Sequence, residues 1–380
     1  MLSLDVRRFP IAAFGSILGT GGVALASLAY LPELALLLTY LLTALFLLFN
    51  ALLAFKAIRH PGVVKAELRH PLPGNFYALQ PISAVILAML YRKVFPSQVD
   101  VALLIYGGAL ILTLSVYLPY HFFSNMNIQF SELHGGWFIT PVATILVTNA
   151  ILLYPVSELT LIVSLLFFGI GATLFLLVLS VLFFRLLSHS LPPTELAPTN
   201  YIMLAPIGIL IADVLQISSS AGPILGTDFV PLATLVGVGL WGFGIWAILV
   251  NLLLLGRYVR GGFPFHIGWW SYVFPTAAYT LGTVSLSKYL GPFGLLSSIL
   301  YLCLVAIWTT VSLGSLRHWL KSLRRPDESM APATSRVPAA ALPNRNGPAS
   351  MLEGKTGRAP RSRALRLSRA RQMEVWDSRI

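Results

Sequence analysis

A chain of 380 residues with 56% hydrophobic and only 11% charged side chains is far more apolar than a soluble domain, and its mean hydropathy of +0.78 agrees. The net charge of +12 divides into +7 for residues 1–325, with 16 basic and 9 acidic side chains, and +5 for residues 326–380, with 10 and 5. The single cysteine, Cys303, excludes a disulfide within the chain and a cysteine metal site, and its apolar surroundings predict a small core residue.

Ten apolar segments follow one another, and each can cross a hydrocarbon core of about 30 Å as a helix. Arg7 and Arg8 precede the first segment with no small-residue cleavage site after them, so we expect no cleaved signal peptide. Ten spans place both termini on one side, and most Lys and Arg residues between spans fall on that side. We predict a multi-pass protein of the plasma membrane with cytoplasmic termini. Its spans are 9–30, 34–56, 75–92, 100–123, 137–155, 159–187, 200–218, 229–256, 266–287 and 293–320.

Every odd-numbered span contains a proline that is followed by a small or β-branched residue. Successive prolines are 71, 60, 65 and 69 residues apart, which is about one helical hairpin each time. This period predicts five repeats of one hairpin, with the odd helices bent at their prolines. The alternative is that the prolines are ordinary packing kinks, because proline is common in membrane helices. The five residues are Pro10, Pro81, Pro141, Pro206 and Pro275.

The two kinds of span also differ in composition. The even spans are nearly uniform runs of Leu, Phe and Val, which suit a position facing lipid, whereas the odd spans contain hydroxyls, amides and glycines that need protein or water around them. We therefore predict an all-α integral membrane fold with odd helices inside, even helices outside and a central pore. The residues predicted to line this pore are Phe14, Ser16, Thr20, Gln80, Ser83, Thr144, Thr148, Thr276 and Thr280.

Three segments, in this order and at this spacing, resemble one known family. They are Phe14-Gly-Ser-Ile-Leu-Gly-Thr-Gly, Ala66-Glu-Leu-Arg-His-Pro and Phe265-His-Ile-Gly-Trp-Trp-Ser-Tyr-Val-Phe-Pro. Over roughly residues 9–320 the chain is similar to the tellurite-resistance and C4-dicarboxylate transporter family, which includes TehA-like proteins, fungal malate permeases and plant guard-cell slow anion channels. The resemblance implies five hairpins around a central anion pore and assembly as a homotrimer.

The resemblance also implies a gate. In the family, a phenylalanine in the kinked part of the ninth helix occludes the pore, and Phe274, next to Pro275, occupies that position here. A ring beside a broken helical turn can swing with little backbone rearrangement and close an apolar constriction. The alternative is an ordinary core aromatic, which is the usual state of a buried phenylalanine.

A few polar residues raise further hypotheses. Asp213 is a lone acid in an apolar span, so it is a candidate for proton coupling; the alternative is that it lies near the outer mouth, within a turn or two of the helix end, and pairs locally. His134 and His266 stand just before odd helices and are expected to be interfacial anchors. Glu67, Arg69 and His70 lie in the cytoplasmic segment between the second and third spans, where we expect an ion pair that acts as a structural lock.

The function predicted from these residues is transport of small anions, such as malate, another C4-dicarboxylate or an inorganic anion, through the pore. A proton-coupled dicarboxylate carrier and an exporter of tellurite- or sulfite-type oxyanions stay open as alternatives. Acids, histidines and phosphate-binding loops do not cluster as an enzyme would require, so we expect no catalysis, cofactor or metal. A receptor is not excluded.

The chain divides into a transport domain, residues 1–325, and a tail, residues 326–380. The tail is rich in Ala, Pro and Ser, and a run of arginines within it lacks a sustained apolar face. This pattern is typical of a disordered basic cytoplasmic segment near anionic lipid. Nucleic-acid binding is the sharper hypothesis but is not expected, because cytoplasmic tails are routinely basic.

Overall fold

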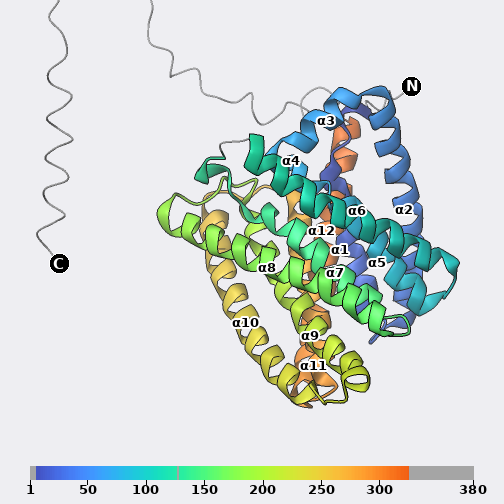
Figure 1. Ribbon diagram of the computed structural model, residues 1–380. Coiled ribbons are helices and arrows are strands. Elements are labelled where there is room, and N and C mark those ends of the chain that lie inside the picture. The colour runs from blue at the N-terminus through green and yellow to red at the C-terminus, as the bar shows by residue number, and fades with distance from the viewer. Residues whose placement is uncertain (1–5, 126–127, 325–380) are drawn as a thin grey trace, which may run out of the picture. The chain divides into compact units, whose positions relative to one another are not determined.

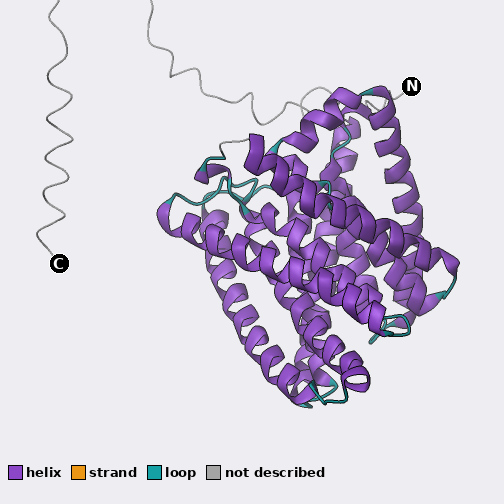
Figure 2. Ribbon diagram, in the orientation of Figure 1, coloured by secondary structure: helices purple, strands orange, loops and turns teal. Residues whose placement is uncertain are grey.

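The computed structural model describes residues 6–125 and 128–324, and helix is the only regular secondary structure among them (Figures 1 and 2). Each predicted span overlaps an α-helix, although the helices of the odd-numbered spans are mostly shorter than the spans predicted for them. The odd-numbered spans become α1 (Phe14–Ser27), α5 (Leu79–Val94), α7 (Ile139–Ile151), α9 (Leu204–Leu225) and α11 (Val273–Ser287). The even-numbered spans become α2 (Pro32–Arg59), α6 (Gln98–Asn125), α8 (Glu158–Ser188), α10 (Val230–Arg260) and α12 (Pro292–Arg324).

Seven of the described helices are long and apolar enough to cross a membrane, and two shorter apolar helices, Ile11–Ser27 and Gly135–Ile151, accompany them. The chain is therefore a multi-pass membrane protein. The segments differ sharply in burial: in its most apolar window, Pro71–Val94 is 89% buried inside the protein, whereas Pro32–Arg59 is 22% and Val230–Arg260 is 17% buried. Helices that expose Leu and Phe around most of their circumference suit contact with lipid.

The five helices that contain the proline motif or follow it contact one another in a closed circuit. α1 packs against α5, α5 against α7, α7 against α9, α9 against α11, and α11 returns to α1. We call these five the inner helices. Each of the other five long helices packs mainly against the inner helix that precedes it in the chain and also contacts the next inner helix around the circuit.

Small residues allow the inner helices to approach closely. A Cβ atom at Gly208 of α9 would overlap the backbone of Ala278 and Tyr279 in α11, so glycine alone fits there. At Gly171 of α8, a Cβ atom would lie 2.7 Å from the backbone nitrogen of Ile145 in α7. Close backbone approach at small residues is a main source of helix packing in lipid, where the hydrophobic effect between helices is weak.

The motif prolines do not sit in the middle of α-helices. Pro81, Pro141, Pro206 and Pro275 are each the third residue of an α-helix, and Pro10 precedes a short 3-10 helix, Ile11–Ala13. Short 3-10 helices also lead into α7, α9 and α11: Gly135–Phe138, Ala197–Met203 and Ile267–Tyr272. At α1, α7, α9 and α11 the predicted bend is accordingly a change from 3-10 to α-helix, whereas α5 follows a short α-helix, Pro71–Phe76. Proline lacks an N–H and fits the first helical turn, where none is needed.

Two local expectations from the sequence are wrong. α9 continues to Leu225 rather than ending near residue 218, because its Ser and Ala residues are compatible with helix and termination awaits Gly226, whose φ is +68°. Cys303 is exposed on α12 rather than buried, because that helix turns much of its apolar surface outward. The predicted tail, residues 326–380, lies outside the described residues.

A buried ion pair fastens the end of α2 to the segment before α5. Lys56 is 1% exposed, and its ammonium group donates to Glu67 Oε1 at 2.7 Å and to the carbonyl oxygen of Phe9 at 2.8 Å. The Tyr77 hydroxyl donates to Glu67 Oε2 at 2.7 Å. Glu67 is therefore in an ion pair, but its partner is Lys56 of α2, 11 residues earlier, and not a residue of its own segment.

Candidate functional site

A cavity of about 290 Å³ opens among the N-terminal parts of the inner helices. We call it the Phe274 cavity. All five inner helices or the segments leading into them contribute to its wall, which is mainly apolar but includes the polar residues Glu195 and His266. The lining includes Gly15, Leu18, Leu79, Ile82, Ile139, Val142, Thr199, Ile202, Trp270, Phe274 and Pro275.

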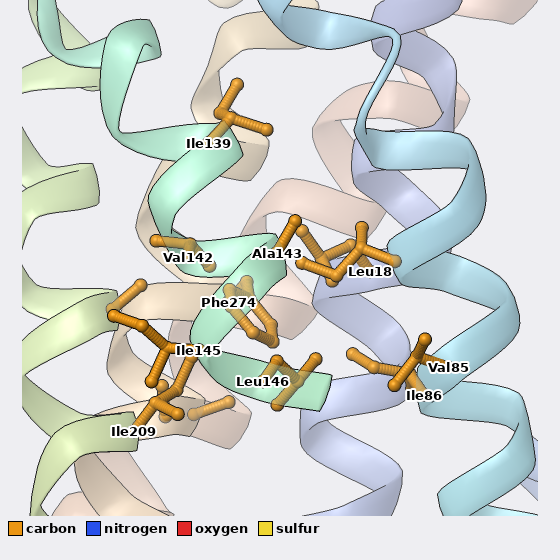
Figure 3. Packing of buried hydrophobic residues seen from close by; sticks show 14 of the residues in the cluster. Leu18, Val85, Ile86, Ile139, Val142, Ala143, Ile145, Leu146, Ile209 and Phe274 are labelled. Carbon is orange, nitrogen blue, oxygen red and sulfur yellow. The ribbon is translucent and has the colours of Figure 1, made fainter. Parts of the chain in front are cut away.

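The Phe274 ring is held among inner-helix side chains and is 6% exposed. Hydrophobic residues from α1, α5, α7 and α9 lie around it in Figure 3: Leu18, Ile86, Leu146 and Ile209. Gly22 of α1 leaves room for the ring, since a Cβ atom there would lie 3.3 Å from Phe274 Cδ2. The sequence placed Phe274 beside Pro275, and the structure places it just after a 3-10 to α junction and in the wall of a cavity.

A second cavity, of about 400 Å³, lies among the C-terminal parts of the same five helices. Its wall is more polar than that of the Phe274 cavity and contains two lysines, Lys93 and Lys288, so we call it the lysine cavity. The two ammonium groups are close enough to interact electrostatically. Asn149, Gln216, Ser219 and Ser285 add neutral polar groups to the wall. Of the described residues that line it, none is an acid, so the field inside favours anions.

Sequence reasoning missed the lysine cavity because it treated each lysine only as a loop charge. Lys93 ends the third predicted span and Lys288 ends the ninth, so the signal was present in the order of the spans. The inner helices run in the same direction, so the C-terminal ends of two of them meet at one end of the bundle. Only the circuit of helix contacts brings the two lysines to one wall.

Asp213 lies near the lysine cavity without facing a charge partner. It is the tenth residue of α9 and is fully buried, while its neighbour Ala212 lines the cavity. Asn149 is its polar neighbour, yet among the described residues neither carboxylate oxygen has a hydrogen-bond partner of good geometry. Asn149 is thus the candidate for the local pairing of Asp213 considered from the sequence, and that alternative stays open. Twelve residues of α9 follow it, so it is also farther from the helix end than expected.

The polar residues predicted to line a pore instead serve contacts between or within helices here. Gln80 bonds Asn50 of α2 and Tyr106 of α6, Thr20 accepts from Trp308 of α12, and Thr148 donates to the carbonyl of Ser164 in α8. Backbone carbonyls of their own helices accept from Ser16, Ser83, Thr144, Thr276 and Thr280, and Phe14 packs edge to face on Phe49. None of the nine lines either of these two cavities, and their pore-lining role stays a prediction.

Histidines begin three of the segments that lead to inner helices. The Nδ1 atoms of His70, His134 and His266 accept from the backbone N–H two residues later, at 3.0 to 3.2 Å. Burial lowers the pKa of His134 to about 4, with Arg185 and His70 adding to the effect, so its imidazole is neutral at neutral pH. The interfacial anchors expected at His134 and His266 are helix caps.

A family model described as voltage-dependent anion channel matches residues 8–316, which include all five inner helices. The chain belongs to this anion channel family. The family resemblance seen in the sequence is thereby confirmed. The residues that line the Phe274 cavity and the lysine cavity all lie within the matched range.

Several relatives of this anion channel family member are transporters. An uncharacterized transporter of Methanocaldococcus jannaschii is 26% identical over 332 residues, covering 81% of this chain and 95% of the relative. A sulfite efflux pump of Arthroderma benhamiae is 22% identical, covering 81% of this chain and 90% of the pump. A malic acid transport protein of Schizosaccharomyces pombe is 20% identical, covering 76% of this chain and 72% of that protein. Family and relatives together identify anion transport across a membrane as the function.

Proposed function

We propose that small anions cross the membrane along a path that joins the lysine cavity to the Phe274 cavity, and that Phe274 gates this path. One observation carries the proposal: the lysine cavity is lined from all five inner helices near their C-terminal ends, and the Phe274 cavity is lined from the N-terminal ends of α1, α5, α7 and α11 and from the 3-10 helix that leads into α9. A path through the middle of the circuit would link them. Phe274 lines the first cavity and does not line the second, so its ring is suited to obstruct the passage between them.

The same proposal includes the membrane arrangement. The ten long helices cross the plasma membrane as five repeated hairpins, with α1, α5, α7, α9 and α11 around the path, and both termini are cytoplasmic. Support comes from the circuit of contacts among the inner helices and from the low burial of the outer ones. Assembly as a homotrimer, and a boundary near residue 325 between the transport domain and a basic tail, follow from the resemblance and the composition.

The substrate class that we propose is a small mono- or divalent anion such as malate, sulfite or an inorganic ion. Two lysines and four neutral polar side chains in one cavity can attract such an anion without holding it tightly, which transport requires. The printed activities of the sulfite and malic acid relatives support this range.

We expect purified protein in liposomes to release entrapped malate, sulfite or chloride faster than protein-free liposomes do. Flux of each radiolabelled or dye-detected anion, with choline as the cation, measures this directly. Equal rates for all three anions with and without the protein would contradict the proposed function.

A proton-coupled carrier is the second candidate function, and it is favoured by the fully buried carboxylate of Asp213, which has Asn149 as a polar neighbour and no ion pair among the described residues. If Asp213 carries the coupled proton, an inward proton gradient should accelerate malate uptake by up to about tenfold per pH unit. D213N should keep uptake at symmetrical pH and lose this acceleration, because an amide cannot exchange a proton. D228N is the control, since Asp228 is exposed and caps α10 through the Val230 N–H. If malate uptake by the wild type does not respond to the proton gradient, the proton-coupled carrier is contradicted and the channel remains as the proposed function.

A further inference from the structure

A third cavity, of about 230 Å³, lies between the outer helices α8 and α10, where α7 and α9 begin. We call it the arginine cavity. It shares no lining residue with the Phe274 cavity or the lysine cavity. Its polar lining consists of His134, Arg185, Asn200 and Asn251, and its apolar lining comes mainly from leucines of α8 and α10.

Arg185 brings a buried positive charge to this cavity without a balancing negative one. Its side chain is 3% exposed, and Nη1 donates to the carbonyl oxygen of Ser190 at 2.8 Å. Nε has no hydrogen-bond partner among the described residues, and none of the described lining residues is an Asp or Glu. Removing a guanidinium ion from water is unfavourable unless an anion or several acceptors compensate.

Two further buried donors line the same cavity. His134 Nδ1 accepts the Gly136 N–H at 3.0 Å, so the proton of the neutral ring is on Nε2. That Nε2 atom and Nδ2 of Asn200 have no hydrogen-bond partner in the part of the chain that the structure describes. The cavity therefore gathers three donors that lack an acceptor, one of them charged. An anionic group with several oxygens is the ligand that would satisfy all three.

The wall on the outer side narrows the choice of anion. Phe183, Leu187 and Trp246 line the cavity and are 50%, 73% and 42% exposed, on faces of α8 and α10 that suit contact with lipid. A free hydrophilic anion gains nothing from such a wall. A molecule with an anionic head and apolar chains contacts both the donors and the apolar face, as anionic lipids do in basic pockets between membrane helices.

We propose that the arginine cavity binds an anionic phospholipid, with its phosphate on Arg185, His134 and Asn200 and an acyl chain along the outer faces of α8 and α10. The lipid phosphate supplies the negative charge that pairs with Arg185, because none of the described lining residues is an acid. Its binding stabilises the folded state, because the unfolded chain has no such site.

The test uses the full chain purified in an uncharged detergent after exhaustive removal of lipid. Dioleoylphosphatidylglycerol, dioleoylphosphatidylcholine or inorganic phosphate is added, thermal unfolding is recorded, and native mass spectrometry counts bound lipid. We expect phosphatidylglycerol to raise the melting temperature in a saturable way and one molecule of it to stay bound per chain. Phosphatidylcholine and inorganic phosphate should have little effect.

Two variants change the site in opposite ways. R185Q removes the charge and N200D supplies an internal anion beside it, so both should lose the response to phosphatidylglycerol. N200D should in addition melt above lipid-free wild type, because the aspartate pairs with Arg185. R260Q is the matched control, since Arg260 is an exposed arginine at the end of α10, and it should respond as wild type does.

Some results would overturn the proposal. If phosphatidylglycerol raises the melting temperature of wild type and R185Q equally, the lipid binds outside the arginine cavity. An equal shift with inorganic phosphate would assign the cavity to a free anion. A folded N200D that still needs phosphatidylglycerol for its stability would show that Arg185 does not require an anion at this site.

Discussion

Replacing Phe274 with alanine should raise anion flux through the reconstituted protein by roughly 30-fold, which corresponds to a barrier lowered by about 2 kcal/mol. The ring is buried among side chains of the other inner helices, in the wall of the Phe274 cavity (Figure 3). Its removal would widen the constriction and reduce the cost of wetting it. Current recorded across a planar bilayer in a chloride gradient is the measurement, and the reversal potential should lie near that of chloride.

F175A is the control for lost packing. Phe175 of α8 is 2% exposed, packs on Phe138 and lines neither the Phe274 cavity nor the lysine cavity. Both variants should lose about 3–5 kcal/mol of stability, the usual cost of a buried Phe→Ala change, while F274A alone gains conductance. If the conductance of F175A rises as much as that of F274A, loosened packing rather than a gate opens the protein. If the conductance of F274A equals that of wild type, Phe274 is not a gate.

The double variant K93Q/K288Q should carry anions more slowly at low salt. Each ammonium group in a water-filled cavity attracts a monovalent anion by about 1 kcal/mol at 4 Å, or roughly fivefold in local concentration. Loss of both lysines should therefore reduce chloride current by roughly 10- to 30-fold at 10 mM salt. At 1 M salt, where the Debye length is about 3 Å, the difference should nearly vanish.

K65Q is the matched control, because Lys65 is an exposed lysine on the short helix Pro61–Arg69, far along the chain from the lysine cavity lining. It should conduct as wild type does at every salt concentration. Equal currents in K93Q/K288Q and wild type at 10 mM salt would mean that anions do not pass the lysine cavity. The single variants should each show part of the loss, since both lysines line the same wall.

The proposed functions of the lysine cavity and the arginine cavity can be tested independently. Lys93 and Lys288 belong to the proposed path, whereas Arg185 lies between outer helices in a cavity that shares none of their lining. K93Q/K288Q should therefore change conductance with no effect on stabilisation by phosphatidylglycerol. R185Q should abolish that stabilisation while leaving the salt dependence of the current intact.

Apolar spans, their alternation and the five prolines were readable from the chain, because a hydrocarbon solvent forces the backbone into helices about as long as the bilayer is thick. The motif segments around Phe14, Glu67 and Phe274 were sufficient for the family resemblance. The position of Asp213 within its helix was not readable from the chain, since the Ser and Ala residues after it gave no clear helix end before Gly226.

The direction in which a polar side chain points was the least predictable feature. Gln80, Thr20 and Thr148 are predicted to line a pore, a role that stays a prediction, and in the structure their side chains bond to outer helices. A hydroxyl in an apolar helix needs a partner, but the requirement is met equally by water, by its own backbone or by a neighbouring helix. Helical periodicity alone does not distinguish these partners.

By itself, the sequence determined the helical membrane fold, the family and hence anion transport, because these depend on local hydropathy and motif residues. Only the tertiary structure decided which residues meet. It closed five inner helices into a circuit, joined Lys93 to Lys288 in one cavity, and brought His134, Arg185 and Asn200 together from three separate segments. Contacts between residues so far apart in the chain depend on the packing of whole helices, which a linear pattern does not specify.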